Sequence, residues 1–211
     1  MKTISGHRGI TSGGPNFAYN HCTRRIPDSA LTQLDISGWR IVFCGAEPIN
    51  AGTLEAFAER FAIMGFKREA FTPCYSLAES TLAVTVGVYE RDLDIISVRT
   101  EALERKWILP AVPGTIGSAE LVGSGTPRGD MAVAIVDGET QAPLPPNEVG
   151  EVWVAGRSVA AGYRQDPEET ASAFGVRTSD GAGPYLRTGD LGFLRNGRLF
   201  IIGCHKRYAT D

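Results

Sequence analysis

Hydrophobic and polar residues follow two different patterns along the chain, and the change comes near Glu120. In the first half, the apolar run WRIVFCGAEP at 39–48 ends in glycine and proline, which is typical of a buried strand followed by a loop. The next segment predicts an amphipathic helix with Asn50 as its N-cap and Gly65 as its end. Its apolar residues recur at helical spacing: Leu54, Phe57, Ala58, Phe61 and Ala62.

A second strand is predicted after this helix, in the segment REAFTPCYS at 68–76. The following segment, LAESTLAVTV at 77–86, fits either a helix or an extended run. Strand, helix and strand in close succession predict a βαβ unit, and therefore a largely parallel sheet in this half of the molecule.

The second half is dominated by short runs typical of β-strands, separated by Gly, Pro, Asn and Asp. These runs lie at 120–127, 131–137, 150–156, 185–194 and 198–203. One helix interrupts them at 166–175, with Asp166 as N-cap, Pro167 at the first helical position and Gly175 at the end. The segment 89–115 is rich in charge and lacks periodicity, apart from a weak helical stretch near 99–107.

Together these patterns predict an α/β fold class. A parallel-type βαβ sheet portion at 1–118 would be followed by a small, mostly antiparallel β-barrel-like subdomain at 119–203. A chain of 211 residues is long enough to bury a sizeable core.

Charge and composition exclude several classes of partner. The chain carries 21 basic and 24 acidic residues, a net charge of -3, so no electrostatic field predicts binding to nucleic acid. No apolar run approaches the roughly 18 residues that a membrane span needs. The first residues also lack the apolar core of a signal peptide, so we expect a cytoplasmic protein.

Three stretches are candidates for ligand chemistry: CGAEPI at 44–49, CYSLAES at 74–80 and RTGDLG at 187–192. Gly45 would let the main chain approach a flat ligand closely. Glu79 could hold Mg²⁺, a hard cation that prefers carboxylate oxygen. Asp190 could accept hydrogen bonds from two vicinal hydroxyls, which is the geometry of a ribose.

Each of these residues also has a purely structural interpretation. Glu47 could be an ordinary loop acid, Glu79 an acid that stabilises the start of a helix, and Asp190 a turn residue. The stretch SGGPNFAY at 12–19 could likewise be a turn that leads into a core helix through Phe17 and Tyr19.

Six stretches in order resemble the fatty acyl-AMP ligases, within the adenylate-forming superfamily of acyl-CoA synthetases, peptide-synthetase adenylation domains and luciferases. They are TSGGPNFAY, WRIVFCGAEPI, REAFTPCYSLAESTL, GEVWVAGRSVAAGY, PEETASAFG and YLRTGDLGFL. The resemblance implies that a fatty acid carboxylate attacks ATP, releases pyrophosphate and forms an acyl adenylate. An acyl-CoA synthetase of the same superfamily is the alternative, which SGGPNFAY and the spacing of FTPCYSLAES disfavour.

The resemblance also implies roles for individual residues. ATP or AMP would be bound by Gly45, Ala46, Glu47, Pro48, Tyr75, Ser76 and Asp190. Among these, Tyr75 would stack on the adenine and Asp190 would hold the ribose. Glu79 would be the catalytic ligand of Mg²⁺. Gly13, Gly14, Phe17 and Ala18 would border the acyl tunnel. The acceptor in such ligases is typically an acyl carrier protein, and an inserted segment associated with that choice would overlap 89–115.

The sequence also departs from the family pattern. It holds no Ser/Thr/Gly-rich phosphate loop and no carboxy-terminal domain with a catalytic lysine. Residues 204–211 resemble a remnant of the family hinge, where Gly203 and Lys206 fit but Cys204 and Arg207 do not. Ser76 stands where a glycine is usual.

These departures predict that the isolated chain is inactive or a very weak ligase, because charge stabilisation at the transition state would be missing. There are two alternatives. The chain could be a non-catalytic remnant that binds adenylate or acts as a scaffold, or it could work together with a complementary chain that supplies the missing parts. An exposed sheet edge would accompany the second alternative.

Overall fold

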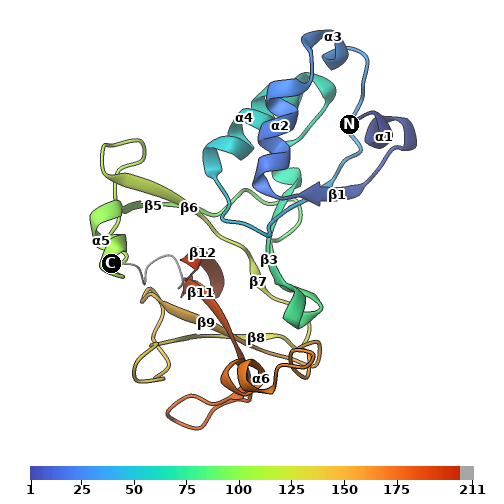
Figure 1. Ribbon diagram of the computed structural model, residues 1–211. Coiled ribbons are helices and arrows are strands. Elements are labelled where there is room, and N and C mark those ends of the chain that lie inside the picture. The colour runs from blue at the N-terminus through green and yellow to red at the C-terminus, as the bar shows by residue number, and fades with distance from the viewer. Residues whose placement is uncertain (205–211) are drawn as a thin grey trace.

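A computed structural model describes residues 1–204 of the chain, which form an upper helical lobe and a lower β-rich lobe (Figure 1). The helices are α1 Lys2–His7, α2 Asn16–Arg25, α3 Asp28–Leu31, α4 Ala51–Phe61, α5 Thr100–Glu104 and α6 Pro167–Ala173, with short 3-10 turns η1 Ala62–Met64, η2 Arg68–Ala70 and η3 Ala78–Ser80. The strands are β1 Thr11–Gly14, β2 Ile41–Cys44, β3 Phe71–Leu77, β4 Leu82–Val86, β5 Ile95–Arg99, β6 Ser118–Val122, β7 Thr126–Pro127, β8 Ala132–Val136, β9 Gly150–Ala155, β10 Phe174–Val176, β11 Tyr185–Arg195 and β12 Arg198–Cys204.

The upper lobe is built on a sheet in the order β1-β2-β3-β4-β7, in which β1, β2 and β3 run parallel. Helix α4 connects β2 to β3, so the predicted βαβ unit is confirmed. The Asn50 side chain accepts a hydrogen bond of 2.9 Å from the Thr53 main-chain N–H, as expected of an N-cap. Beyond α4, one 3-10 turn ends at Gly65, whose φ of 80° favours glycine.

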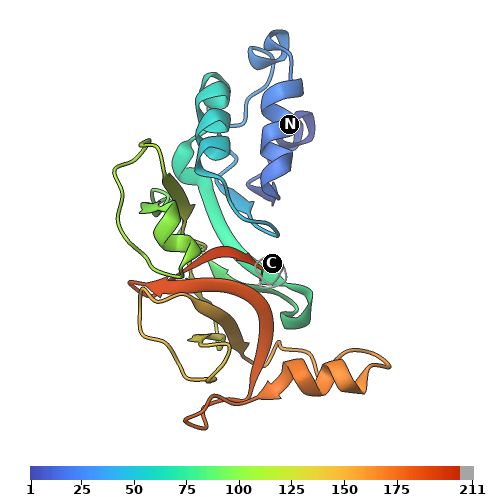
Figure 2. The same ribbon diagram turned by 60° about the vertical axis from the view of Figure 1, so that its left-hand side comes forward.

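An aromatic cluster fills the space between this sheet and the helices α2 and α4, which lie side by side in Figures 1 and 2. Phe57 lies at its centre, and its ring centroid is 5.1 Å from that of Tyr19, 5.0 Å from that of Phe66 and 4.5 Å from that of Phe61. Most of these ring pairs are edge-to-face, the geometry that the quadrupoles of aromatic rings favour. The helical spacing therefore predicts the buried residues Leu54, Phe57, Ala58 and Phe61 correctly. Ala62 is the exception, because it lies in η1 beyond the helix and is exposed.

Two segments that the sequence left ambiguous are strands. Residues 77–86 form the turn η3 and then β4, which pairs antiparallel with β3, so the extended alternative is correct. Strand β5, in the charge-rich segment 89–115, pairs antiparallel with β6 and was missed. Charged residues flank β5 closely and hide its short apolar run, whereas α5 lies in the stretch expected to be weakly helical.

The lower lobe confirms the expected fold class. Its sheet has the order β10-β11-β9-β8, with β12 paired to β11, and every pairing is antiparallel. Figure 2 shows that the long strand β11 curves strongly, so the sheet curls on itself like part of a barrel. Asp166 is the N-cap of α6, and its side chain accepts a hydrogen bond of 3.0 Å from the Glu169 N–H.

The division of the chain at residue 118 stays a prediction. The short strand β7 follows that position and still pairs with β4 of the first sheet. Lys206 and Arg207, which belong to the expected hinge remnant, lie outside the described residues. Within residues 1–204, no helix combines the length and apolar character needed to cross a membrane.

Candidate adenylate-binding site

A cavity of about 280 Å³ lies where the two lobes meet. Six of the residues expected to bind the nucleotide line it, and they come from three separate segments: Ala46, Glu47, Pro48, Tyr75, Ser76 and Asp190. The loop after β2, the end of β3 and a bend in β11 thus meet around one space. Its volume is close to the lower end of the range typical for small-molecule sites.

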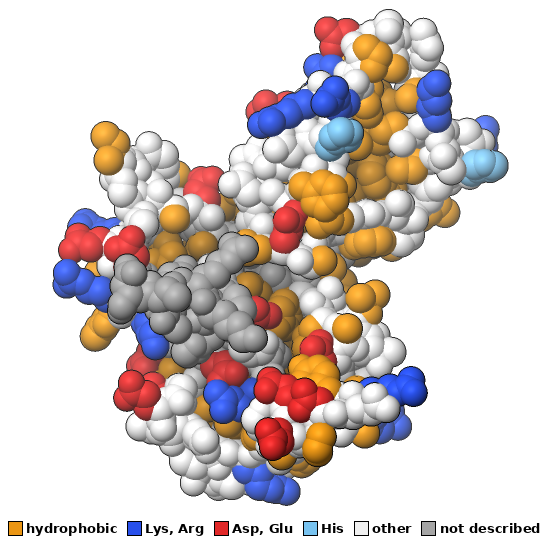
Figure 3. Space-filling view, viewed as in Figure 1, with side chains coloured by type: hydrophobic (Ala, Val, Ile, Leu, Met, Phe, Trp, Pro, Cys, Tyr) orange, Lys and Arg blue, Asp and Glu red, His pale blue; other side chains and the backbone are white. Residues whose placement is uncertain are grey.

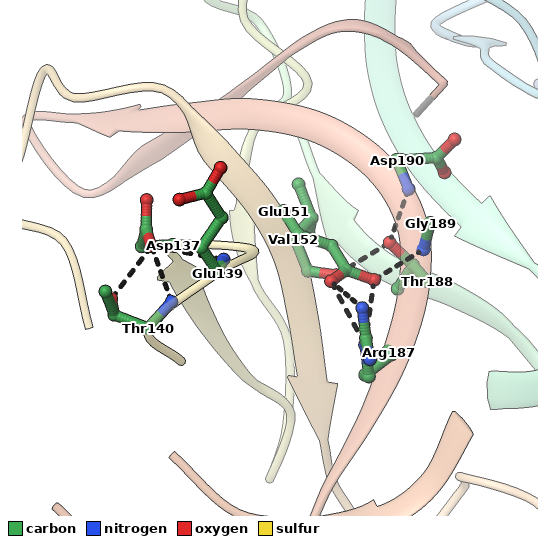
Figure 4. Close-up of polar contacts among 9 residues, drawn as sticks. All are labelled: Asp137, Glu139, Thr140, Glu151, Val152, Arg187, Thr188, Gly189 and Asp190. Atoms are coloured by element: carbon green, nitrogen blue, oxygen red, sulfur yellow. Dashed lines mark hydrogen bonds and ion pairs between the residues drawn. The ribbon is translucent and has the colours of Figure 1, made fainter. Parts of the chain in front are cut away.

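Asp190 faces this cavity from an irregular part of β11. The register between β11 and β9 shifts between Arg187 and Leu191, so Thr188, Gly189 and Asp190 bulge away from the regular ladder. Figure 4 shows these residues on the curved strand, with the Asp190 carboxylate directed away from β9. Burial raises the pKa of Asp190, and the charges of Glu79 and Glu151 add to this, while a hydrogen bond from Tyr75 acts in the opposite direction.

Tyr75 joins the two lobes across the cavity. Its hydroxyl donates a hydrogen bond of 2.7 Å to Asp190 Oδ2, between residues that are distant in sequence. Burial, followed by the charge of Asp190, raises the pKa of Tyr75, so the phenol remains a neutral donor. Only 7% of Tyr75 is exposed, and stacking of its ring on an adenine stays a prediction.

The loop after β2 needs its glycine because the main chains pass very close to each other. A Cβ on Gly45 would lie 2.5 Å from the Cys74 carbonyl oxygen and 2.8 Å from Cys74 Sγ, so a side chain does not fit there. Ala46 follows with a φ of 66°, in the left-handed region. Ala46 and Glu47 are both exposed, and this tight path turns them toward the cavity.

The four residues expected at the acyl tunnel lie at the end of β1 and the start of α2. A Cβ on Gly13 would lie 2.0 Å from the Phe43 carbonyl oxygen, so this glycine allows β1 and β2 to pack closely. Gly14 lies next to Ala18, and Phe17 is 66% exposed. The Phe17 N–H donates a hydrogen bond of 2.7 Å to Glu47 Oε1, which connects this region to the cavity wall.

Glu79 lies in the turn η3 rather than at the start of an α-helix, and it does not line the cavity. Its Oε1 accepts a hydrogen bond of 3.0 Å from the Tyr163 hydroxyl, and its carbonyl accepts one of 2.7 Å from the Ala160 N–H. Within residues 1–204, no three acidic, His or Cys side chains gather as a metal site would require. A single carboxylate still fits Mg²⁺, because this ion keeps several waters and shares phosphate oxygens.

The cavity wall also contains residues that the sequence analysis missed. Val122, Ser124, Ile201 and Gly203, from β6, the residues after it and β12, line it together with Ile49 and Cys74 of the candidate stretches. Nothing in the local sequence assigns Val122, Ser124 or Ile201 to the site, and Gly203 was expected only as part of the hinge pattern. Their place in the wall depends on how β12 folds back beside β6.

Comparison with known proteins decides the family. The AMP-binding enzyme family matches residues 6–164, which is most of the chain. The chain belongs to this family. It is 42% identical over 206 residues to the medium-chain-fatty-acid–[acyl-carrier-protein] ligase JamA of Moorena producens, covering 96% of this chain and 35% of the relative. It is 38% identical to the 4-hydroxyphenylalkanoate adenylyltransferase of Mycobacterium tuberculosis, covering 96% and 33% respectively.

A solved structure agrees with these relatives. The fatty acyl-adenylate ligase of Legionella pneumophila, in complex with acyl adenylate and pyrophosphate, matches with a TM-score of 0.92 and 41% identity. That match covers 97% of this chain and 36% of the Legionella chain. The chain is therefore similar to proteins named as fatty acid ligases and fatty acyl-adenylate ligases, and it spans about a third of the length of the relatives that it matches.

Proposed function

We propose that this chain carries the adenosine-binding part of an AMP-forming fatty acid ligase. The observation that supports this most strongly is the convergence of Glu47, Tyr75 and Asp190 on one cavity. The three residues come from different segments, and each was expected at the nucleotide from the resemblance of its stretch to the family. Asp190 accepts the ribose hydroxyls, while the Ala46–Pro48 loop and the Tyr75 ring hold the adenine.

The substrate that we propose is a fatty acid, and the reaction is its conversion to an acyl adenylate with ATP. Relatives named as ligases of medium-chain fatty acids with acyl carrier proteins support this choice. An acyl carrier protein is accordingly the proposed acceptor. Gly13, Gly14, Phe17 and Ala18 border the acyl group in this proposal. Glu79 contributes one carboxylate oxygen to Mg²⁺, whose role is to neutralise phosphate charge.

Calorimetry tests the adenosine site directly. We expect AMP and an acyl sulfamoyl-adenosine, a non-hydrolysable analogue of the acyl adenylate, to bind the wild-type chain. Asp190→Ala should abolish binding of both ligands while the chain stays folded. The matched control is Asp180→Ala, since Asp180 is an exposed acid in the turn before β11. Absence of binding at millimolar ligand would refute the proposal.

A scaffold role without catalysis is the second candidate. The observation that favours it is the position of Glu79, which accepts a hydrogen bond from Tyr163 and is not part of the cavity lining. ATP–pyrophosphate exchange with medium- and long-chain fatty acids separates the two functions. Robust exchange by the chain alone would exclude the scaffold role, whereas AMP binding without exchange would support it.

The surface of the upper lobe favours a complementary polypeptide as a partner. Strand β1 is at the edge of its sheet, and Ile10 and Phe17 near it are 56% and 66% exposed. Figure 3 shows hydrophobic side chains gathered on this lobe. Unpaired edges with apolar neighbours tend to pair with other chains. Light scattering tests this, because a monodisperse monomer that melts cooperatively would contradict a required partner.

A further inference from the structure

The bulge that carries Asp190 rests on a buried acid that the family motifs did not single out. Glu151, in β9, is 3% exposed, whereas its neighbour across the sheet, Arg187, is partly open to solvent. An acid buried to this degree is rare unless its charge is paired and its oxygens are hydrogen-bonded. Glu151 meets both conditions, and its partners all lie on the segment that leads to Asp190.

The Glu151 carboxylate takes the place of the ladder that the bulge interrupts. Its Oε1 accepts a hydrogen bond of 3.2 Å from the Gly189 N–H, which has no main-chain partner on β9 at this point. Its Oε2 accepts hydrogen bonds of 3.1 Å from Arg187 Nε and 2.9 Å from Arg187 Nη2. One side chain therefore holds the bulge at two positions, as Figure 4 shows.

Two further contacts fix the remaining residues of the bulge. The Thr188 hydroxyl donates a hydrogen bond of 2.7 Å to the Val152 carbonyl and accepts one of 3.1 Å from the Asp190 N–H. Arg187 Cζ lies 5.7 Å from the centre of the Trp153 ring, which holds the guanidinium over β9. Strand β12 pairs with Asp190 and Leu191 on the other side of β11, so the side-chain contacts that hold the bulge come from β9. Among these, Glu151 supplies the charged contacts.

We propose that Glu151 is the positioning residue that aims Asp190 at the ribose, acting through Arg187 and the Gly189 N–H. This inference rests on the proposed adenosine site and adds the residue that fixes the shape of its ribose-binding bend. Glu151 touches no part of the ligand. Its effect is to hold the carboxylate of Asp190 at the cavity and within reach of Tyr75.

Glu151 also acts on Asp190 through its charge. In the described part of the chain, the groups that influence Asp190 are Tyr75 on β3, Glu79 in η3 and Glu151 on β9. Glu151 and Glu79 both raise the pKa of Asp190, after burial, so removing the Glu151 charge lowers that pKa. Ribose binding needs the ionised form of Asp190, so AMP binding has an acid limit, the pH below which protonation of Asp190 abolishes it. Removing the Glu151 charge moves this acid limit to lower pH.

The test uses Glu151→Gln, with Glu139→Gln as the matched control. Glu139 is an exposed acid after β8, and Figure 4 draws no interaction between its carboxylate and the bulge. In Glu151→Gln, amide hydrogen exchange at Gly189 should accelerate about tenfold. Affinity for AMP at neutral pH should fall about tenfold, the effect of losing one charged hydrogen bond at a binding residue. Glu151→Asp, which keeps the charge but shortens the side chain, should restore the acid limit without restoring the affinity.

The outcomes separate this inference from the proposed function. Weaker AMP binding together with an acid limit shifted to lower pH supports the positioning role, since a loss of folding alone would not shift that limit downward. Unchanged Gly189 exchange and an unchanged Asp190 pKa, measured by NMR in folded Glu151→Gln, would overturn it. Failure of the wild-type chain to bind AMP, with the exchange and pKa changes present, would refute the adenosine site and confine Glu151 to shaping the bulge.

Discussion

The two lobes form the walls of one cavity, but different forces hold those walls in place. The upper wall rests on the aromatic cluster around Phe57, where shape and apolar burial determine the position of the main chain. The lower wall rests on a bulge held by the polar contacts of Glu151, Arg187 and Thr188. A close-packed apolar core leaves no room for an unpaired polar group, whereas a hydrogen-bonded bulge can present a carboxylate to a ligand. The site thus combines an apolar support in the upper lobe with a hydrogen-bonded polar support in the lower lobe.

The largest effect is expected from Phe57→Ala in the upper lobe. Phe57 is 1% exposed and contacts several rings, so the substitution leaves a cavity at the centre of the cluster. The free energy of unfolding should fall by about 3–5 kcal/mol. Urea unfolding followed by tryptophan fluorescence measures this, because Trp39 lies in the same cluster. Phe57→Leu serves as the control, with an expected loss of about 1.5 kcal/mol. A loss below that value for Phe57→Ala would contradict the cluster as the support of the upper wall.

A smaller loss is expected from Arg187→Ala in the lower lobe. The substitution leaves the carboxylate of Glu151 buried without its cation, which is strongly destabilising in closed interiors. The side chain of Arg187 is 36% exposed, so water relieves part of this penalty and we expect a loss of about 2 kcal/mol.

The control for this variant is Arg157→Ala. Arg157 pairs with Asp130, but its side chain is 93% exposed, and the expected change is below about 0.5 kcal/mol. Equal losses in the two variants, measured by the same urea unfolding, would show that burial of Glu151 does not distinguish its ion pair from a surface pair.

The two helix N-caps allow the same substitution to be compared in both lobes. Asn50 caps α4, which packs into the aromatic cluster, whereas Asp166 caps α6, which is mostly exposed. Asn50→Ala should lower the free energy of unfolding by about 1 kcal/mol, since α4 unfolds together with the core. Asp166→Ala should lower it by less than half as much, because α6 can fray locally. Thermal unfolding and hydrogen exchange along each helix measure the difference, and equal global losses would contradict it.

Both caps could be read from the sequence, and the reason is physical. A cap, an amphipathic period and a glycine at a tight turn depend on residues that are close in sequence, as with Asn50 and Gly65. Asp190 could be assigned to a nucleotide because its motif resembles that of a family. Its hydrogen bond with Tyr75 could not be predicted, since the two residues are brought together only when the β-rich lobe folds against the first sheet.

Glu151 shows the limit of local reasoning more clearly. In the sequence it is one acid in a strand-forming run, and nothing nearby indicates that it is buried. Its importance comes from the register shift between β11 and β9. Because of this shift the Gly189 N–H lies outside the β11–β9 ladder, and the Glu151 side chain on β9 accepts its hydrogen bond. Strand β5 was missed for a related reason, because its pairing with β6 compensates for a short and charge-flanked run.

The smallest effects concern pH, and they should have opposite signs in the two lobes. In the upper lobe, hydrogen bonds from Arg68 lower the pKa of Glu55, so this pair stabilises the fold above the ordinary glutamate pKa and is lost as pH falls through the lowered value. Glu55→Gln should therefore lower stability at neutral pH by less than about 1 kcal/mol, since the side chains of Arg68 and Glu55 are 33% and 37% exposed, and should have no effect in acid.

Asp190 should behave in the opposite way. Its pKa is raised, so the folded protein holds this proton more tightly than the unfolded chain, and stability falls as pH rises from the ordinary value of 3.8 through the raised one. Asp190→Asn removes that fall and should make the chain slightly more stable at neutral pH while abolishing AMP binding. Unfolding curves between about pH 2 and about pH 8, a range that includes the ordinary carboxyl pKa values and the region below them, measure both variants. A loss of stability in Asp190→Asn at neutral pH would mean that the carboxylate supports the lower wall, and the contrast between the lobes would not extend to the acid at the cavity.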